Sequence, residues 1–170
     1  MTDTLSVRVA TAADLANLHP VIERAYRGDS ARQGWTHEAD LLSGERTDLA
    51  TLEAMVADPT QILLIAEEGD VAIGCVSLTA RGDGLVYLGL LCVDPTRQAG
   101  GIGKRIIAAA ERLSREQLDA ERIEMTVIDS RSELIAYYER RGYVRTGERR
   151  PFPIAVVPPL SMVVLEKALA

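Results

Sequence analysis

Apolar and polar residues alternate along two short segments of the chain, residues 5–9 and residues 123–127. Leu5, Val7 and Val9 carry the first alternation. Successive side chains of a β-strand point to opposite faces of a sheet, so a period of two predicts strands that bury one face. Both segments are therefore predicted to be half-buried strands.

Denser apolar runs between these two segments predict strands that are covered on both faces. Residues 61–67 and 71–78 flank a Glu-Gly-Asp turn, which is a hairpin signature, and residues 85–93 follow a second turn that contains two glycines. Two further strands are predicted, one from Tyr143 and one near residues 162–165.

Apolar residues spaced three and four apart predict helices between the strands. Thr11 can cap the first helix with Asp14 as its capping-box partner, Pro20 is expected to kink or restart this helix, and Gly28 is expected to end it. Three more helices are predicted, near residues 49–56, after the glycines at 101–103, and near residues 131–141. The predicted order is β-α-α-β-β-β-α-β-α-β-β, in a single domain of residues 1–170.

Composition narrows the class of protein. Hydrophobic residues make up 47% of the chain and charged residues 26%, which is ordinary for a soluble globular domain. No apolar run approaches the roughly 18 residues of a membrane span, and no signal peptide opens the chain, so we expect a cytoplasmic protein. The net charge of −6 argues against a general nucleic-acid surface and suits a cationic substrate weakly. Cys75 and Cys92 lie in apolar runs, and are predicted to be buried, reduced thiols.

One loop carries the strongest functional signal. Residues 93–104 read Val-Asp-Pro-Thr-Arg-Gln-Ala-Gly-Gly-Ile-Gly-Lys, between a predicted strand and a predicted helix. The start of a helix presents free backbone N–H groups and the positive end of the helix dipole, which suits a phosphate or pyrophosphate. Gly101 and Gly103 lack Cβ atoms that would hold such a ligand away from the backbone.

The spacing of the glycines separates three families of phosphate-binding loops. A P-loop would need glycine where Gln98 stands and a hydroxyl residue where Arg105 stands, and a dinucleotide fingerprint would need glycine in place of Ile106. The remaining pattern, Val-x-Pro-x-x-Gln/Arg-x-x-Gly-x-Gly, is filled from Val93 to Gly103. This segment resembles the acyl-CoA pyrophosphate loop of the GNAT superfamily of N-acetyltransferases, although that family usually has glycine where this chain has Ala99.

A second segment strengthens the resemblance. Residues 131–143 are similar to the family's motif of a short helix that ends in Tyr-Glu-x-x-Gly-Phe/Tyr, and the match falls on Tyr138, Glu139, Gly142 and Tyr143. The family often has asparagine at the head of this helix, where this chain has Arg131. The resemblance implies an α/β (α+β) fold, with a mixed, mostly antiparallel sheet of about seven strands flanked by four helices.

The resemblance also implies a reaction. A primary amine of a small molecule or peptide would attack acetyl-CoA directly, with no acyl-enzyme and no metal, and a backbone N–H in residues 91–93 would stabilise the oxyanion. Tyr138 would protonate the departing thiolate, whereas its neighbour Tyr137 is expected to pack. The expected acetyl-CoA-binding residues are Leu91, Val93, Gln98, Ala99, Gly100, Gly101, Ile102, Gly103 and Lys104.

Several points stay open at the level of sequence. No carboxylate lies in the strand of residues 87–93, so Glu38, Asp40, His37 or a water chain could accept the amine proton. Other residues could either serve the site or act only in packing and on the surface; these are Arg32, Trp35, Arg46, Arg97, Lys104, Arg105 and the turn at 151–153. The acceptor, the acyl-chain length and the choice between monomer and homodimer are open. Alternatives are a degenerate domain that binds acyl-CoA as a sensor or docking module, and acylation of an amine bound to tRNA.

Overall fold

The computed structural model describes residues 5–26, 47–97, 101–152, 157 and 159–169. Seven strands form one sheet: β1 (Leu5–Val9), β2 (Gln61–Glu68), β3 (Val71–Gly82), β4 (Leu85–Val93), β5 (Arg122–Ile128), β6 (Val144–Pro151) and β7 (Ser161–Ala168). Four α-helices accompany the sheet: α1 (Leu15–Tyr26), α2 (Leu49–Ala57), α3 (Ile102–Leu118) and α4 (Ser132–Arg140). The predicted order of strands and helices is confirmed.

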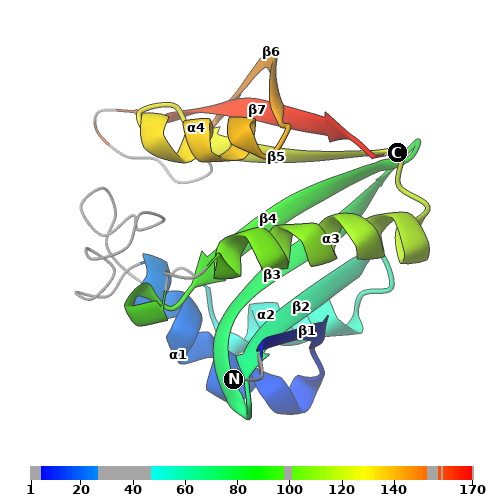
Figure 1. The fold of residues 1–170 in the computed structure, drawn as a ribbon, viewed down its shortest axis with the longest axis vertical. Helices are drawn as coiled ribbons and strands as arrows, with labels where there is room; N and C mark the ends of the chain where they lie inside the picture. Colours follow the sequence, from blue (N-terminus) through cyan, green and yellow to red (C-terminus); the bar gives the residue numbers. More distant parts are fainter. Residues whose placement is uncertain (1–4, 27–46, 98–100, 153–156, 158, 170) are drawn as a thin grey trace.

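The strands lie in the spatial order β1-β2-β3-β4-β5-β7-β6. All neighbouring strands are antiparallel except β4 and β5, which run parallel (Figure 1). The sheet is therefore mixed and mostly antiparallel, as expected, and its single parallel junction joins a first half, β1 to β4, to a second half, β5, β7 and β6.

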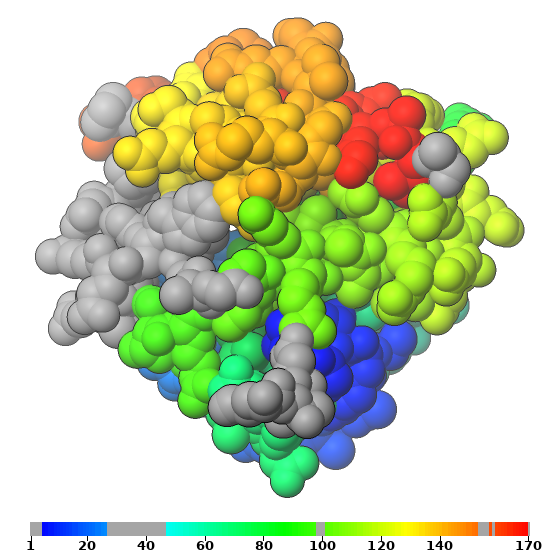
Figure 2. Space-filling model, in the orientation of Figure 1, coloured from blue at the N-terminus to red at the C-terminus, as the bar shows by residue number. Residues whose placement is uncertain are grey.

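The two faces of the sheet carry two separate cores. One core packs apolar residues of α3 and α4, among them Ile106 and Ile135, against β2 to β5 and β7. The other packs α1 and α2 against β2, β3 and β4, with Leu18 and Leu52 fully buried. In Figure 2, α3 crosses the visible face of the molecule below α4. Helices therefore cover both faces of the first half of the sheet.

The start of the first helix differs from the simple expectation. Residues 12–14 form one 3₁₀ turn before α1, and the Asp14 carboxylate accepts hydrogen bonds from the Thr11 backbone N–H at 2.7 Å and the Thr11 hydroxyl at 3.1 Å. Pro20 does not restart the helix, because α1 continues through it to Tyr26. Loss of one backbone donor is tolerated in a helix whose apolar face is buried by Leu18 and Ile22.

Gly28, which was expected to end this helix, lies outside the described residues. The two cysteines behave as predicted. Cys75 and Cys92 are paired across β3 and β4, fully buried and not joined by a disulfide, with their sulfur atoms 3.6 Å apart.

Candidate active site

A cavity opens where β4 and β5 separate. The two strands pair only from Leu85 to Tyr87 on β4, opposite Arg122 to Glu124 on β5, and then diverge (Figure 1). The cavity has a volume of about 360 Å³ and is lined by residues from both strands and from α4, including Leu91 and Tyr138. Beyond Tyr87, the edge of β4 that faces away from β3 has no strand beside it among the described residues.

A β-bulge shapes the β4 wall of this cavity. Leu90 and Leu91 together stand opposite the single residue Val76, because the register with β3 shifts between Gly89 and Cys92. Leu90 has a φ of 52°, a left-handed conformation that costs a non-glycine residue about 1–2 kcal/mol. The Leu91 carbonyl accepts a hydrogen bond from the hydroxyl of Tyr26 on α1. Packing therefore holds β4 in a bent conformation at the cavity.

Asp94 fixes the chain where it leaves β4. Its carboxylate, almost fully buried, accepts hydrogen bonds from Arg24 at 2.8 Å and from the Thr96 backbone N–H and hydroxyl at 3.1 and 2.9 Å. Burial alone would raise the pKa of Asp94, but these hydrogen bonds outweigh burial and hold the pKa below its usual value. The start of the predicted phosphate loop is thus tied to α1 by a charged contact.

The glycine loop itself is described in part. Gln98, Ala99 and Gly100 lie outside the described residues. Gly101 has a φ of 76° and directly precedes α3, and the Gly101 carbonyl accepts the Arg105 N–H at 3.2 Å, so the N–H groups of residues 102–104 belong to the open first turn of the helix. The left-handed conformation of Gly101 gives a local reason for glycine at this position.

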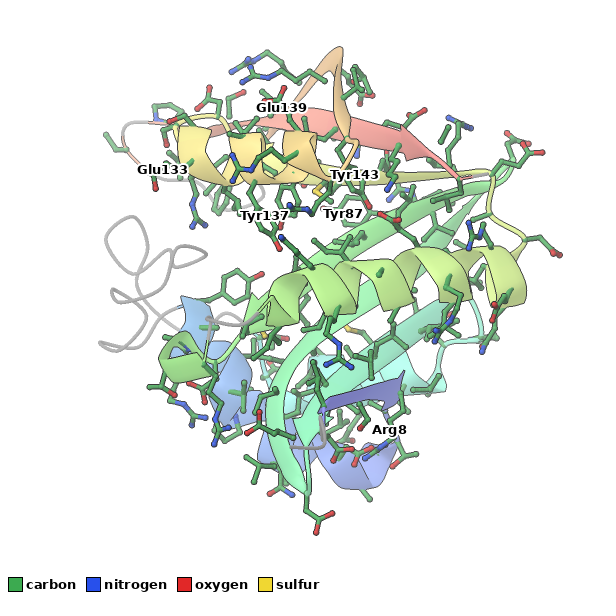
Figure 3. The ribbon with its side chains drawn as sticks, in the orientation of Figure 1. Arg8, Tyr87, Glu133, Tyr137, Glu139 and Tyr143 are labelled. Carbon is green, nitrogen blue, oxygen red and sulfur yellow. The ribbon has the colours of Figure 1, made fainter. Side chains whose placement is uncertain are left out.

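Gly103 has a different reason for lacking a side chain. A Cβ atom at this position would lie 2.9 Å from the hydroxyl oxygen of Tyr137, which reaches α3 from α4. Figure 3 shows Tyr137 directed from α4 toward α3. The guanidinium of Arg141 lies 4.4 Å from the centre of the Tyr137 ring. The prediction that Tyr137 packs is therefore confirmed, and Gly103 permits this contact between helices.

The three cations near the loop have different surroundings. Arg97 forms an ion pair with Glu68 at 2.5 Å, and Arg105 donates a hydrogen bond to the Leu5 carbonyl at 3.2 Å. Lys104 is exposed and forms no ion pair with any residue that the structure describes. Of the three cations, Lys104 is the one on the first turn of α3 that is not held by a described partner.

Tyr138 lies in the wall of the cavity. Its ring is 5% exposed and packs edge-on against Tyr137 and Tyr143, with ring centres 5.6 and 6.1 Å away. Burial, reinforced by the neighbouring Tyr137, raises the pKa of Tyr138 well above its usual value of about 10. Its hydroxyl forms no hydrogen bond with a described residue. The side chain is thus a protonated donor at neutral pH.

The structure brings together Leu91 and Tyr138 but separates them from the loop. Val93 is buried in the core against α3, and residues 101–104 do not line the cavity. A ligand that touched both places would have to extend along β4 from the cavity to the start of α3. That geometry fits a long molecule with a reactive end and a phosphorylated end.

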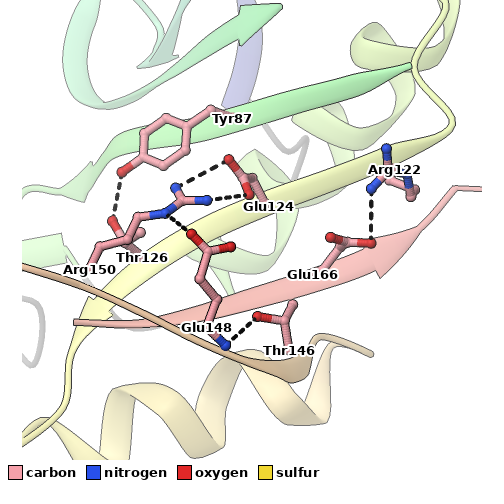
Figure 4. A network of polar contacts seen from close by, with 8 residues as sticks. All are labelled: Tyr87, Arg122, Glu124, Thr126, Thr146, Glu148, Arg150 and Glu166. Atoms are coloured by element: carbon pink, nitrogen blue, oxygen red, sulfur yellow. Dashed lines mark hydrogen bonds and ion pairs between the residues drawn. The ribbon is translucent and has the colours of Figure 1, made fainter. Parts of the chain in front are cut away.

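Three residues of the site could not be assigned from sequence. Tyr87 and Thr126 both line the cavity, and their hydroxyls are 2.7 Å apart across the junction of β4 and β5 (Figure 4). Arg131 lines the cavity at the head of α4. The one sequence signal at Arg131 was that similar sequences often have asparagine at this position.

Other residues named from the sequence lie outside the described part of the chain: Arg32, Trp35, His37, Glu38, Asp40 and Arg46. Within the described residues, no three His, Cys, Asp or Glu side chains gather in a way that could hold a metal ion. None of the helices described is both long and apolar enough to cross a membrane.

Comparison with known proteins places the chain in a family. The profile of the Acetyltransferase (GNAT) family matches residues 23–143. Mycothiol acetyltransferase from Salinispora tropica is 40% identical over 62 residues, a match that covers 36% of this chain and 20% of that relative. The chain therefore aligns with only a fifth of the length of that curated relative.

Solved structures share the whole fold. The PaiA N-acetyltransferase from Thermoplasma acidophilum, in complex with coenzyme A, has a TM-score of 0.74 at 17% identity, over 96% of this chain and 98% of that one. Spermidine N-acetyltransferase from Vibrio cholerae, in complex with CoA and spermine, has a TM-score of 0.72 at 16% identity, over 99% and 97%. At such identities the likeness concerns the fold.

Proposed function

Because the chain belongs to the acetyltransferase (GNAT) family, we propose that it transfers an acetyl group from acetyl-CoA to a primary amine. The observation that supports this proposal is the cavity between β4 and β5, which is lined by Tyr138 and by residues of the part of β4 that no strand accompanies. The cavity and the open first turn of α3 lie at two ends of one path along β4, as an extended co-substrate requires.

The residues present fit acetyl-CoA. The first turn of α3, after Gly101, offers backbone N–H groups and an exposed Lys104 to the pyrophosphate. The open edge of β4 offers backbone groups to the amides of the pantetheine arm, as an unpaired strand edge does for any extended amide chain. The expected contacts of Leu91, Val93 and Ile102 are part of this proposal, as are those of the three loop residues that lie outside the described chain.

The reaction would proceed by direct attack within a ternary complex. The amine nitrogen forms a bond to the acetyl carbon, the bond from carbon to sulfur breaks, and the thiolate takes a proton from Tyr138. Backbone N–H groups of residues 91–93 would stabilise the oxyanion that develops on the acetyl oxygen. The described lining of the cavity contains neither a carboxylate nor a histidine. The amine would therefore lose its proton to a water chain or to Glu38, Asp40 or His37, which lie outside the described residues.

The test of this proposal removes the hydroxyl of Tyr138 and keeps its aromatic ring. Tyr138→Phe should lower kcat by about 10²- to 10⁴-fold with the affinity for acetyl-CoA unchanged, since general acid catalysis contributes an effect of this size. Tyr137→Phe is the matched control on the next residue, and should retain most of the activity. The measurement is thiol release from acetyl-CoA with pooled primary amines, beside calorimetric binding of acetyl-CoA.

Two results would contradict the proposal. Acetyl-CoA binding without thiol release from any pool would favour a sensor over an enzyme. Loss of acetyl-CoA binding in Tyr138→Phe would make this residue a packing element. The pH profile adds a check: burial raises the pKa of Tyr138, so deprotonation of this acid should cause no loss of activity as the pH rises from 7 to about 10.

A further inference from the structure

One buried hydroxyl in the cavity wall lacks a hydrogen-bond partner among the described residues. Ser77, on β3, is 7% exposed and lines the cavity. Its hydroxyl forms no hydrogen bond with any residue that the structure describes. Buried polar side chains in native proteins are generally hydrogen-bonded, because an unpaired buried donor or acceptor is unfavourable. An unpaired hydroxyl in the wall of a cavity therefore points to a contact with the ligand of that cavity.

Gly89 keeps space open beside this hydroxyl. Ser77 and Gly89 stand opposite each other on β3 and β4, and both line the cavity. A Cβ atom at Gly89 would lie 3.3 Å from the hydroxyl oxygen of Ser77 and 3.0 Å from a ring carbon of Tyr87. Any larger residue at position 89 would thus press against the hydroxyl. The glycine leaves the Ser77 hydroxyl accessible from the cavity.

Ser77 and Tyr138 reach the cavity from opposite faces of the sheet. Ser77 is paired with Leu63 of β2, whose side chain packs in the core below α1 and α2. Directly opposite residues of an antiparallel pair share a face, so the side chain of Ser77 lies on the face of α1 and α2. Tyr138 comes from α4 and packs in the core on the other face. A ligand between β4 and β5 can therefore contact one residue from each side.

The proposed reaction brings two groups to the acetyl carbon, the departing thiolate and the attacking amine. Tyr138 would give its proton to the sulfur atom from the face of α4. The amine then has the face of α1 and α2 from which to approach, and this is the face of Ser77. A hydroxyl oxygen can accept one N–H of a primary amine while the lone pair of the nitrogen stays free to attack.

We propose that the hydroxyl of Ser77 accepts a hydrogen bond from the acceptor amine and positions its nitrogen for attack on the acetyl carbon. The inference rests on the proposed acetyltransferase function and identifies a residue that binds the acceptor. The serine takes no proton and stays a neutral hydroxyl throughout. The bonds that form and break are those of the transfer itself, nitrogen to carbon and carbon to sulfur.

The experiment separates binding of the acceptor from binding of acetyl-CoA. The acceptor is the amine that the unchanged protein acetylates fastest among polyamines, amino acids, aminoglycosides and lysine peptides. Ser77→Ala should lower kcat/KM for this amine by about 10- to 100-fold, the loss expected for a hydrogen bond to a charged donor. The affinity for acetyl-CoA, measured by calorimetry, should stay unchanged. Ser77→Cys, which keeps a weak hydrogen-bonding group, should lose less activity.

A thermal measurement distinguishes this role from a structural one. Ser77→Ala removes no side-chain hydrogen bond within the described chain, so it should not lower Tm. Ser114, on α3, is the matched control: its hydroxyl is fully buried with no hydrogen-bond partner in the described structure, and it does not line the cavity. Ser114→Ala should likewise not lower Tm, and should leave kcat/KM for the amine unchanged.

The failures of the two proposals look different. Thiol release by the unchanged protein, with equal kinetics in Ser77→Ala, would overturn the role of Ser77 and leave the acetyltransferase intact. A weaker affinity for acetyl-CoA in Ser77→Ala would place the hydroxyl on the co-substrate instead, and a lower Tm would make Ser77 a structural residue. Binding of acetyl-CoA without thiol release from any of these amines would overturn the proposed function, and this inference with it.

Discussion

The two halves of the sheet differ in how far helices cover them. Helices cover both faces of β2, β3 and β4, and long antiparallel ladders join these strands. In the second half, α4 covers one face, and β6 is exposed along almost its whole length. The polar contacts of Arg150 with Glu124 and Glu148 lie in this half (Figure 4). The first half is covered by helices on both faces, whereas the second is covered on one face and contains the buried ion pair of Glu124 with Arg150.

The difference explains where the cavity lies. Three residue pairs and the hydrogen bond between Tyr87 and Thr126 join β4 to β5, and an ion pair between Lys167 and Glu111 joins β7 to α3. Tyr143 also donates a hydrogen bond to Glu111 at 2.9 Å. The strands β4 and β5 are thus paired at one end of the junction only, and the cavity lies at the other end.

The largest effect is expected from the buried charge in the second half. Arg150→Met leaves Glu124, whose side chain is 4% exposed, without the cation that pairs with it, and should lower the free energy of unfolding by about 3–5 kcal/mol. The measurement is urea unfolding followed by circular dichroism. The double variant Glu124→Leu with Arg150→Met should recover most of the loss. A small loss in Arg150→Met would show that water replaces the arginine.

Glu148→Gln is the matched control for this pair. It removes the exposed partner of the same arginine, and should change the stability by less than about 1 kcal/mol. If Glu148→Gln and Arg150→Met lowered the free energy of unfolding equally, the buried contact of Arg150 with Glu124 would stabilise the protein no more than its exposed contact with Glu148.

Two glycine substitutions test the packing of each half. A Cβ atom at Gly74, on β3, would lie 2.4 Å from the Cys92 carbonyl oxygen, a backbone atom of β4. Gly74→Ala should therefore lower the free energy of unfolding by about 2–3 kcal/mol. Gly147, on β6, has open space around it and a φ of 89°, so Gly147→Ala should cost only about 1 kcal/mol. Thermal unfolding of both variants measures the difference, and a reversed order would contradict the packing described for β3 and β4.

The smallest effect concerns the charged contact between α1 and the end of β4. The pKa of Asp94 is lower in the folded protein than the usual value of about 3.9. Its carboxylate therefore adds stability above pH 3.9, and the contribution is lost as the pH falls through the folded pKa. Asp94→Asn should cost about 1 kcal/mol at pH 7. The gap between this variant and the unchanged protein should close below about pH 3.9, and a gap that persisted there would mean that hydrogen bonding, and not charge, is responsible.

Local patterns explain why most of the fold could be predicted. Alternation in β1 and β5, the turn between β2 and β3, and the glycines before α3 are each readable within a few neighbouring residues. The Thr11 capping box depended on a spacing of three. Pro20 was expected to kink or restart α1, and the restart is wrong, because burial of α1 is a tertiary effect that the sequence of one helix does not reveal.

The candidate site could be predicted only where a motif marked it. Tyr138 and Gly101 belong to motifs; in the structure Tyr138 lines the cavity and Gly101 directly precedes α3. Arg150 approaches Glu124 from β6, which lies beyond β7 in the sheet, so no local spacing announces this pair. Where β4 and β5 have separated, β4 contains a leucine in the left-handed conformation, which the residue type does not predict.

Leu90 is in effect one residue more than β4 needs. Gly89 faces Ser77 across the sheet, Leu90 packs in the core of α1 and α2 on that same face, and Leu91 resumes the alternation in the opposite core. Excising Leu90 would leave every other side chain of β4 on its present face and let the ladder with β3 run unbroken. Deletion of this one residue would therefore give a shorter β4 without the bulge and without a leucine in the left-handed conformation. The extra residue instead bends β4 beside the cavity.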